Sequence, residues 1–314
     1  MQDTLYTRFP GEPIKHQVGR FEKVDLNRGD LEGFVVCDYR LENNYKFIEG
    51  SGDTVFHKKS NPVVVDKPEY LLQGEELKSG IINNKLSKAI LSRVKNAGNI
   101  EDPVKLFHQL DQAYPSAFIY LISSQEFGTW IGATPETLIE HEGSNGQTMS
   151  LAGTLPVNEG EWSQKEIEEQ RYVTEFIEGK LIHLGMSPMV EEVTESIAGP
   201  VRHLKSDITF TCDRQQLGRL VQSLHPTPAV SGMPREESMK LIDSVEKHDR
   251  QLYAGVIGRI EEHSRLFVNL RCAQLCESGL FLYLGGGYTK DSVIESEWDE
   301  TENKAKTLLS LLNN

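Results

Sequence analysis

AFIYLISSQEFGTWIGATPETLIEHEGSNGQTMSLAGTL, the stretch from residue 117 to residue 155, holds three runs rich in β-branched and aromatic side chains, which Gly, Asn and Pro separate. Runs of this kind between turn-forming residues are typical of β-strands. We therefore predict strands over residues 117–123, 129–140 and 148–155. The first 80 residues are richer in turn-forming residues and show only short strand-like runs, at 33–39 and 62–65.

The same patterns predict further strands and helices on the C-terminal side. The strands cover residues 85–94, where a helix is the alternative, 255–260, 265–275 and 280–284, and the helices cover 163–184, 234–253 and 296–312. The triplet Gly285-Gly286-Gly287 is expected to end the last strand in a tight turn, although its N–H groups also suit an anion. Strand-rich stretches interrupted by long helices, without βαβ alternation, indicate an α+β fold with mainly antiparallel sheets.

Length and composition favour one globular domain over residues 1–314. The 47 acidic and 33 basic residues give a net charge of −14, which argues against a nucleic acid partner. No apolar run approaches the roughly 20 residues needed to span a bilayer, and no secretion signal opens the chain, so we expect no membrane association. Four cysteines give no disulfide framework, which favours a reducing, cytoplasmic setting.

Several common catalytic motifs are absent from the sequence. It contains no GxxxxGK[ST] phosphate loop, no GxGxxG that opens a helix, no HExxH and no GxSxG. Nucleotide-driven, nicotinamide-dependent and serine-hydrolase activities therefore lose their best support.

Helical carboxylates provide a stronger indication. Glu297, Glu300 and Lys304 are spaced by three and four residues and share one face of the predicted C-terminal helix, although salt bridges on a solvated face would give the same spacing. Glu169 shares a helical stripe with Val173 and Phe176. Carboxylates from two helices, without His or Cys companions, suit a hard ion such as Mg²⁺.

Three charged residues lie inside otherwise apolar predicted strands. They are Lys88, Glu136 and Arg271. Such residues can simply face solvent in an antiparallel sheet, and spacing alone does not exclude this alternative.

Eight segments taken together resemble the chorismate-utilising enzymes, a family that includes isochorismate, salicylate, anthranilate and aminodeoxychorismate synthases. The segments are KAILSR at 88–93, GATPE at 132–136, LAGT at 151–154, RHL at 202–204, HPTPAVSG at 225–232, DR and YAG at 249–255, LRCA at 270–273 and EWDETENK at 297–304. The resemblance covers residues 81–314, and residues 1–80 match weakly. Thr134 and Gly286 depart from the family pattern, in which Ser and Ala are common at these positions.

The resemblance implies two large packed antiparallel β-sheets with helices outside, a chorismate substrate and Mg²⁺. A lysine at the position of Lys88 is typical of the members that add water, so isochorismate synthase is the expected activity and no glutaminase subunit is expected. The product would serve menaquinone or siderophore biosynthesis. The alternative is salicylate synthase, which also eliminates pyruvate, and an anthranilate or aminodeoxychorismate synthase is less favoured.

The resemblance also implies roles for individual residues. Adding water at C2 of chorismate and expelling the C4 hydroxyl requires a base and an acid. Lys88 matches the base, whose pKa should be depressed, and Glu136 matches the acid, whose pKa should be raised. Glu169 and Glu300, with Glu297 nearby, match the Mg²⁺ ligands. The implied substrate contacts are Gly153, Thr154, His203, Ala229, Tyr253, Leu270, Arg271, Gly285 and Lys304, although His203 is equally well interpreted as a packed, hydrogen-bonded histidine.

Overall fold

The computed structural model describes residues 2–28, 31–158, 160–198 and 201–312, apart from the side chains at positions 154, 165, 198 and 201. Its helices are α1 (Lys67–Asn83), α2 (Pro103–Ala113), α3 (Gln164–His183), α4 (Leu217–Leu224), α5 (Arg235–Val245) and α6 (Ile294–Leu312), with a 3₁₀ turn at Arg214–Gln216. Its strands are β1 (Asp3–Arg8), β2 (Lys15–Lys23), β3 (Gly33–Cys37), β4 (Asn44–Glu49), β5 (Lys88–Asn96), β6 (Phe118–Ser124), β7 (Gly128–Thr134), β8 (Thr137–Glu142), β9 (Asn145–Pro156), β10 (Met189–Val190), β11 (Thr194–Ala198), β12 (Val201–Thr211), β13 (Gly232–Met233), β14 (Val256–Ile260), β15 (His263–Val268), β16 (Cys272–Cys276) and β17 (Gly279–Tyr288).

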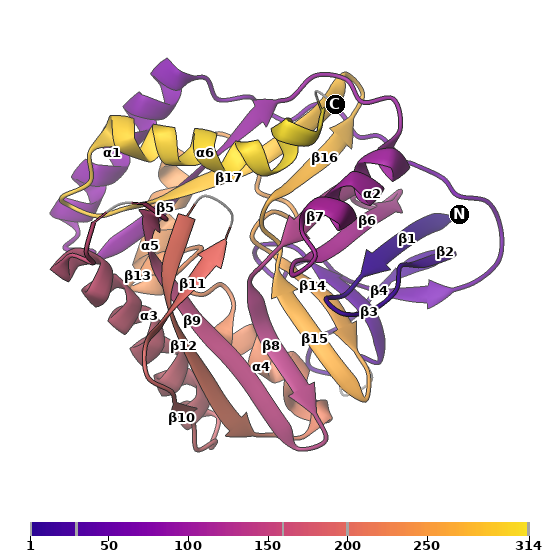
Figure 1. Ribbon diagram of the computed structural model, residues 1–314, viewed down its shortest axis with the longest axis horizontal. Helices are drawn as coiled ribbons and strands as arrows, with labels where there is room; N and C mark the ends of the chain where they lie inside the picture. The colour runs from indigo at the N-terminus through magenta and orange to yellow at the C-terminus, as the bar shows by residue number, and fades with distance from the viewer. Residues whose placement is uncertain (1, 29–30, 159, 199–200, 313–314) are drawn as a thin grey trace.

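The ladders between these strands are all antiparallel and join into one series. Its order is β13-β5-β17-β16-β7-β6-β1-β2-β4-β3-β14-β15-β8-β9-β12, and β10 and β11 both pair with β12. The series folds back on itself (Figure 1), so that Phe118 of β6 stacks on Phe267 of β15 with ring centroids 4.8 Å apart. The α+β fold with packed antiparallel layers is therefore confirmed, and hydrogen bonds join the layers into one sheet.

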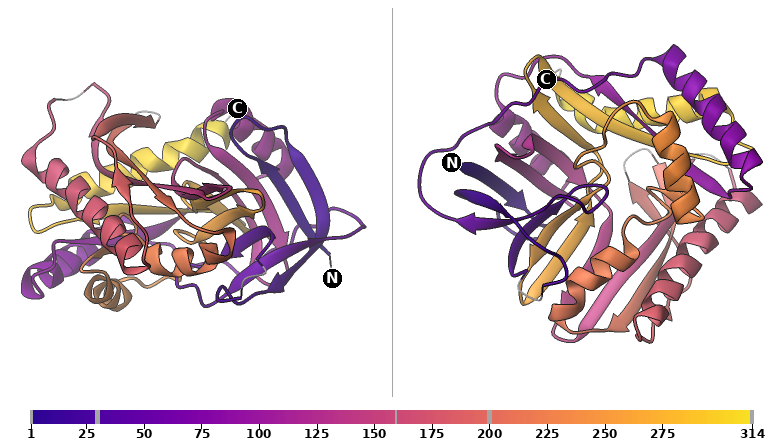
Figure 2. Two further views of the ribbon diagram at one scale, coloured as in Figure 1. Left: turned by 90° about the horizontal axis from the view of Figure 1, so that it is seen from below. Right: turned by 180° about the vertical axis from the view of Figure 1, so that it is seen from behind.

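Strand β6 shows how the layers and the helices share the apolar residues. Phe118, Tyr120 and Ile122 face the large core between the two halves of the sheet, whereas Ile119 and Leu121 belong to a second core with residues of α2 and α6. Successive side chains of a strand point to opposite faces, so a strand covered on both faces has a continuous apolar run. The helices lie on the outside of the strands, as Figure 2 shows from two further sides.

Two predicted strands are each broken in the structure. The strand predicted over residues 129–140 is interrupted between β7 and β8, where Pro135 has no N–H to donate to a ladder. The strand predicted over 265–275 is interrupted between β15 and β16, where Arg271 has a φ of 49°. The N–H of Val268 donates to the carbonyl of Glu136 at 2.9 Å, so the two interruptions are held side by side.

The glycine triplet does not end a strand, contrary to the prediction. Strand β17 continues through Gly285–Gly287 to Tyr288 and pairs there with Ser92–Ala89 of β5. The glycines permit close approach instead of a turn. A Cβ on Gly285 would lie 2.6 Å from the Tyr253 hydroxyl oxygen, and one on Gly287 would lie 2.9 Å from Cε of Lys88.

Two of the three predicted helices are confirmed as α3 and α6, and the third is shorter than predicted. Helix α5 ends at Val245 instead of continuing to residue 253, because Glu246 is extended, with φ −69° and ψ 132°. Further on, Gln251 and Ala254 adopt positive φ values of 49° and 58°, so the helix does not resume. The strand predicted over 85–94 is confirmed as β5, which begins at Lys88 and so excludes the helical alternative.

The N-terminal region contains more regular structure than predicted. Helix α1 lies in it, as do strands β1, β2 and β4, and residues 62–65 form no strand. Helices α2 and α4 were not predicted either. Glycine lowers the helix propensity of α1 at Gly74 and Gly80. Both positions are packing contacts, since a Cβ on Gly80 would lie 2.3 Å from Leu241.

Among the residues that the structure describes, no helix combines the length and apolar composition needed to cross a membrane.

Candidate functional site

A cavity of about 150 Å³ lies where the two strand interruptions meet α3 and α6. The predicted site residues that line it are Lys88, Glu136, Glu169, His203, Ala229, Tyr253, Leu270, Arg271, Gly285, Glu297, Glu300 and Lys304. These residues come from positions throughout the chain, so the fold brings together side chains that the sequence separates by up to about 200 residues. Their convergence is a geometric result, and their chemical roles stay predictions.

The two remaining predicted residues are Gly153 and Thr154. The carbonyl of Gly153 is 3.0 Å from Nδ1 of His203, so Gly153 is one contact away from the cavity. The side chain of Thr154 lies outside the described part of the structure. His203 is therefore both a cavity residue and a hydrogen-bonded one, and burial lowers its pKa to about 4, which keeps its ring neutral at pH 7.

Several residues of the cavity wall were not predicted from the sequence. They include Ile90, Glu166, Val230 and Tyr283. Glu166 precedes Glu169 by three residues on α3, so helical spacing offered a signal for it. The apolar residues gave no such signal because nothing distinguishes them from the core.

Lys88 is the first residue of β5, and its side chain is 9% exposed. Its Nζ donates to a carboxylate oxygen of Glu169 on α3. The adjacent strand makes room for the lysine stem, because Gly287 has no Cβ to meet Lys88 Cε. The cation is thus held at the edge of the cavity by a carboxylate from a helix distant in sequence.

Helix α6 supplies a second cation paired with a carboxylate. Nζ of Lys304 donates to Glu300, four residues earlier, and at 2.8 Å to the carbonyl of Gly285. Burial alone would raise the pKa of Glu300, but the Lys304 ammonium, with a smaller contribution from Lys88, lowers it overall. Glu300 is therefore ionised at neutral pH.

Glu136 has the opposite electrostatic character. Burial raises its pKa from 4.5 to about 7, although the cations of Lys88, Lys304 and Arg271 oppose the rise. A carboxyl with this pKa carries a proton in about half of the molecules at neutral pH. A group with this pKa is able to donate a proton at neutral pH, and the role of Glu136 as the acid stays a prediction.

Arg271 occupies the other strand interruption and lines the same cavity. Its guanidinium is half-buried and its Nη1 donates to the Thr307 hydroxyl at 3.1 Å. Burial lowers the pKa of Arg271, but an arginine keeps its charge at physiological pH. Its planar fork is suited to binding a carboxylate through two hydrogen bonds.

The carboxylates of α3 and α6 have the donor chemistry that Mg²⁺ prefers. Glu169, Glu297 and Glu300 line one cavity and offer only oxygen ligands. Within the described residues no group of three acidic, His or Cys side chains forms a ready metal cage. Mg²⁺ commonly takes one or two protein carboxylates and completes its shell with water and substrate, so this donor set fits.

The chain belongs to the chorismate-binding enzyme family. The profile of that family, described as "Chorismate binding enzyme", matches residues 46–313. The match includes every predicted site residue and leaves only the first N-terminal strands outside.

Individual relatives agree with this assignment. The chain is 30% identical over 267 residues to the isochorismate synthase MenF of Bacillus subtilis, covering 79% of this chain and 56% of that protein. It is 28% identical over 270 residues to anthranilate synthase component 1 of Aquifex aeolicus, covering 80% and 52%. The chain thus spans just over half the length of these two relatives.

The fold matches solved structures over nearly the whole chain. The structure of MenF, the menaquinone-specific isochorismate synthase from Escherichia coli, superposes with a TM-score of 0.82 at 19% identity, covering 99% of this chain and 88% of that chain. The antiparallel sheet with its helices outside is therefore the fold of this family.

Proposed function

We propose that this protein converts chorismate to isochorismate in a reaction that requires Mg²⁺. Water adds to C2 of the ring, the ring double bonds shift, and the C4 hydroxyl leaves with an added proton as water, so that substrate and product are isomers. One proton must be removed from the attacking water and one delivered to the departing hydroxyl.

The observation that carries this proposal is that one cavity is lined by Lys88 of β5, by Glu136 from the interruption between β7 and β8, and by Arg271 from the interruption between β15 and β16. A neutral Lys88 would take the proton of the attacking water. A protonated Glu136 would give its proton to the C4 oxygen, and its pKa of about 7 supports that role. Water is a poor nucleophile and hydroxide a poor leaving group, so both groups are needed.

The same cavity provides positive charge for a dianionic substrate. Arg271 would hold the side-chain carboxylate of chorismate, and Lys304, which lines the same cavity, would add a second cation. Glu169 and Glu300, with Glu297 close by, would hold Mg²⁺, which supplies positive charge for the ring carboxylate when bound. A chain of net charge −14 needs this concentration of local positive charge to attract the substrate.

The proposal is tested by incubating the purified protein with chorismate and Mg²⁺ and identifying the product by mass spectrometry and NMR. We expect isochorismate in reversible equilibrium with chorismate, and loss of turnover in excess EDTA. Glu300→Ala should remain folded and turn over negligibly at any Mg²⁺ concentration. Full activity in EDTA would contradict the metal assignment.

The same assay separates the alternatives. Stoichiometric pyruvate and salicylate would favour a salicylate synthase, and anthranilate formed from added ammonia would favour the amine-adding relatives. Action without a glutaminase subunit, a cytoplasmic location and a role in menaquinone or siderophore biosynthesis stay predictions.

A further inference from the structure

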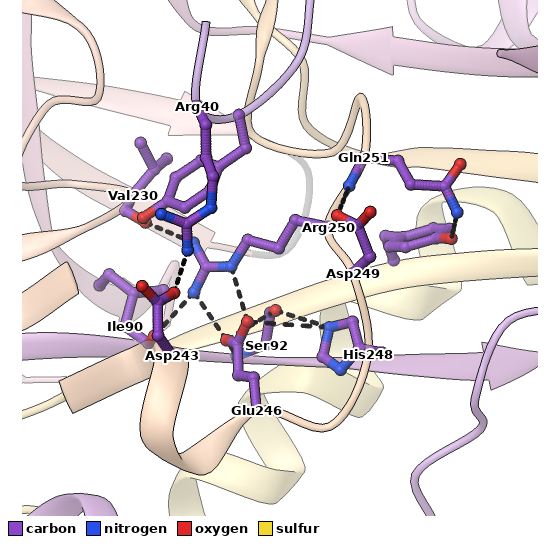
Figure 3. Close-up of polar contacts among 12 residues, drawn as sticks. Arg40, Ile90, Ser92, Val230, Asp243, Glu246, His248, Asp249, Arg250 and Gln251 are labelled. Carbon is purple, nitrogen blue, oxygen red and sulfur yellow. Dashed lines mark hydrogen bonds and ion pairs between the residues drawn. The ribbon is translucent and has the colours of Figure 1, made fainter. Parts of the chain in front are cut away.

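The turn after α5 contains a buried arginine whose hydrogen bonds reach three segments of the chain (Figure 3). Arg250 is 3% exposed, and its Nε and Nη2 donate to the two carboxylate oxygens of Glu246 at 2.9 and 2.7 Å. Its Nη1 donates to the carbonyl of Val230 at 2.8 Å, and Nη2 also donates to the carbonyl of Ile90 at 2.9 Å. One planar fork thus joins its own turn to strand β5 and to the segment before β13.

Both backbone acceptors of Arg250 belong to walls of the candidate active site. Ile90 and Val230 line the cavity, whereas neither Arg250 nor Glu246 is among the described residues that do. Ile90 lies two residues after Lys88 on the same side of β5, and Ala229 precedes Val230. Arg250 therefore contacts the backbone of two residues that line the cavity.

The outer edge of β5 explains why side chains are needed there. On that edge the two-residue strand β13 lies opposite Lys88 and Ala89, and the Ile90 N–H donates to the Ser231 carbonyl at 3.0 Å. Beyond Ala89, the Ile90 carbonyl accepts from Arg250, and the Ser92 N–H donates to Glu246 at 2.6 Å. These side chains satisfy the polar groups that a neighbouring strand would otherwise satisfy, and leaving such groups unpaired in the interior is costly.

A third cavity residue depends on the same turn. The N–H of Tyr253 donates to the carbonyl of Arg250 at 2.8 Å, and Tyr253 lines the cavity. Ser92 is held in addition by His248, whose Nε2 is 2.9 Å from the Ser92 hydroxyl. The turn therefore has a fixed position relative to β5, and its tyrosine has a fixed position relative to the cavity.

We infer that Arg250, oriented by Glu246, is a positioning residue that sets where β5 presents Lys88 to the substrate. The inference rests on the proposed function of Lys88 as the base. A base must lie within hydrogen-bond reach of the proton that it removes, and a misplacement of about 1 Å can lower a rate about 100-fold. Loss of the fork would release the edge of β5, and with it the position of Lys88, without removing any side chain that lines the cavity.

Arg259 offers a matched control. It forks onto Glu12 at 2.7 and 2.5 Å and lies 4.4 Å from the centre of the Phe9 ring, just as Arg250 lies 4.4 Å from the ring of Tyr39. Arg259 is also not among the described residues that line the cavity. Arg250→Lys and Arg259→Lys therefore remove the same kind of fork and keep the charge.

The experiment measures kcat and KM for chorismate at saturating Mg²⁺, and the ¹H–¹³C signal of Lys88 in protein labelled at lysine Cε. We expect Arg250→Lys to lower kcat about 10- to 100-fold, with a smaller change in KM, and to shift the Lys88 signal. Arg259→Lys should leave both kcat and the Lys88 signal near those of the wild type, even if its melting temperature falls equally.

Two outcomes would overturn the inference. One is an unshifted Lys88 signal or an unchanged kcat in Arg250→Lys while the wild type is active, and the other is an equal loss of kcat in Arg259→Lys. A wild type that forms no isochorismate would instead contradict the proposed function, and the Lys88 signal would still show whether Arg250 positions this side chain.

Discussion

Two buried arginines, Arg250 behind the cavity and Arg259 at the tip of the β14–β15 hairpin, make nearly the same primary contacts. Each forks onto one carboxylate, Glu246 or Glu12, and each lies over an aromatic ring. Their exposures are 3% and 9%, so both charges are largely removed from water. Judged by the ion pair alone, the two arginines have the same role.

The remaining hydrogen bonds separate the two regions. Arg250 holds the carbonyls of Ile90 and Val230 in two walls of the cavity, whereas Arg259 donates to the carbonyl of His263 in its own hairpin. A buried ion pair therefore acquires a functional role through the segments that it ties together. Other pairs of residues of the same type can be compared in this way, one acting at the cavity and the other away from it.

The largest effect is expected for Lys88, the first residue of β5. Lys88→Ala should lower kcat by about 10²–10⁴-fold while chorismate still binds, because a base contributes chiefly in the transition state. The control is Lys95→Ala, since Lys95 lies on the same strand but pairs with Glu302 outside the cavity lining. Steady-state kinetics and equilibrium binding of chorismate provide the measurements. Wild-type kcat in Lys88→Ala would show that Lys88 is not the base.

A second comparison concerns the carboxylates of the two forks. Glu246→Ala leaves the Arg250 charge buried without its partner, so the free energy of unfolding should fall by about 3–5 kcal/mol. Glu12 pairs with Arg265 as well as Arg259, but 24% of its side chain is accessible against 5% for Glu246, so water screens the unpaired charges and Glu12→Ala should cost less. Urea denaturation measures both changes. Equal losses of stability accompanied by equal losses of kcat would remove the distinction between the two regions.

The third prediction uses the raised pKa of Glu136. A carboxyl with a folded pKa of about 7 and an ordinary pKa of 4.5 holds its proton more tightly in the folded state. Its contribution to the free energy of unfolding therefore falls as the pH rises from 4.5 to 7 and stays low above that range. Glu136→Gln removes this dependence. The difference in free energy of unfolding between variant and wild type should therefore be more favourable to the variant at pH 8 than at pH 4, by on the order of 1–3 kcal/mol.

Urea denaturation of wild type and variant at both pH values tests this difference. Glu140→Gln is the control, because Glu140 lies on the neighbouring strand β8 and its carboxylate is 2.8 Å from Nε2 of His263 instead of facing the cavity. If both variants change stability with the same pH dependence, Glu136 does not have the environment described for it.

The smallest effect is expected at the glycines of β17. A Cβ on Gly287 would displace the end of the Lys88 side chain, which is flexible, so Gly287→Ala should lower kcat about tenfold with little change in melting temperature. At Gly286 the nearest atoms would lie 3.4–3.6 Å from a new Cβ, so Gly286→Ala should cost less activity. A larger loss for Gly286→Ala would show that this strand does not act through Lys88.

The sequence predicts those helices and strands that have a clear periodic pattern of apolar residues within their own segment. Helices α3 and α6 lie where the pattern placed them, and so do the carboxylates Glu169 and Glu300. The breaks beside Glu136 and Arg271 were not predicted, because an apolar run does not show where a strand changes direction. Those breaks are the positions at which the sheet presents charged residues to the cavity.

Long-range contacts account for the rest of what was missed. The glycine triplet of β17 predicts a turn when only the local sequence is considered. In the structure these glycines make room for the side chains of Tyr253 and Lys88, which come from distant parts of the chain. Arg250 is 160 residues from its acceptor Ile90, so no spacing within its own segment indicates the bond. The cavity residues themselves were predicted because family resemblance carries this long-range information.

The most direct test of the proposed reaction is the source of the new hydroxyl oxygen. Chorismate and Mg²⁺ should be incubated with the protein in H₂¹⁸O, with Lys88→Ala and Lys95→Ala in parallel, and the product examined by mass spectrometry and ¹³C NMR. We predict one ¹⁸O atom per isochorismate, at C2, formed by the wild type and by Lys95→Ala and not by Lys88→Ala. Isochorismate without label, or labelled product formed equally by Lys88→Ala, would contradict the assignment of Lys88 as the base that activates water.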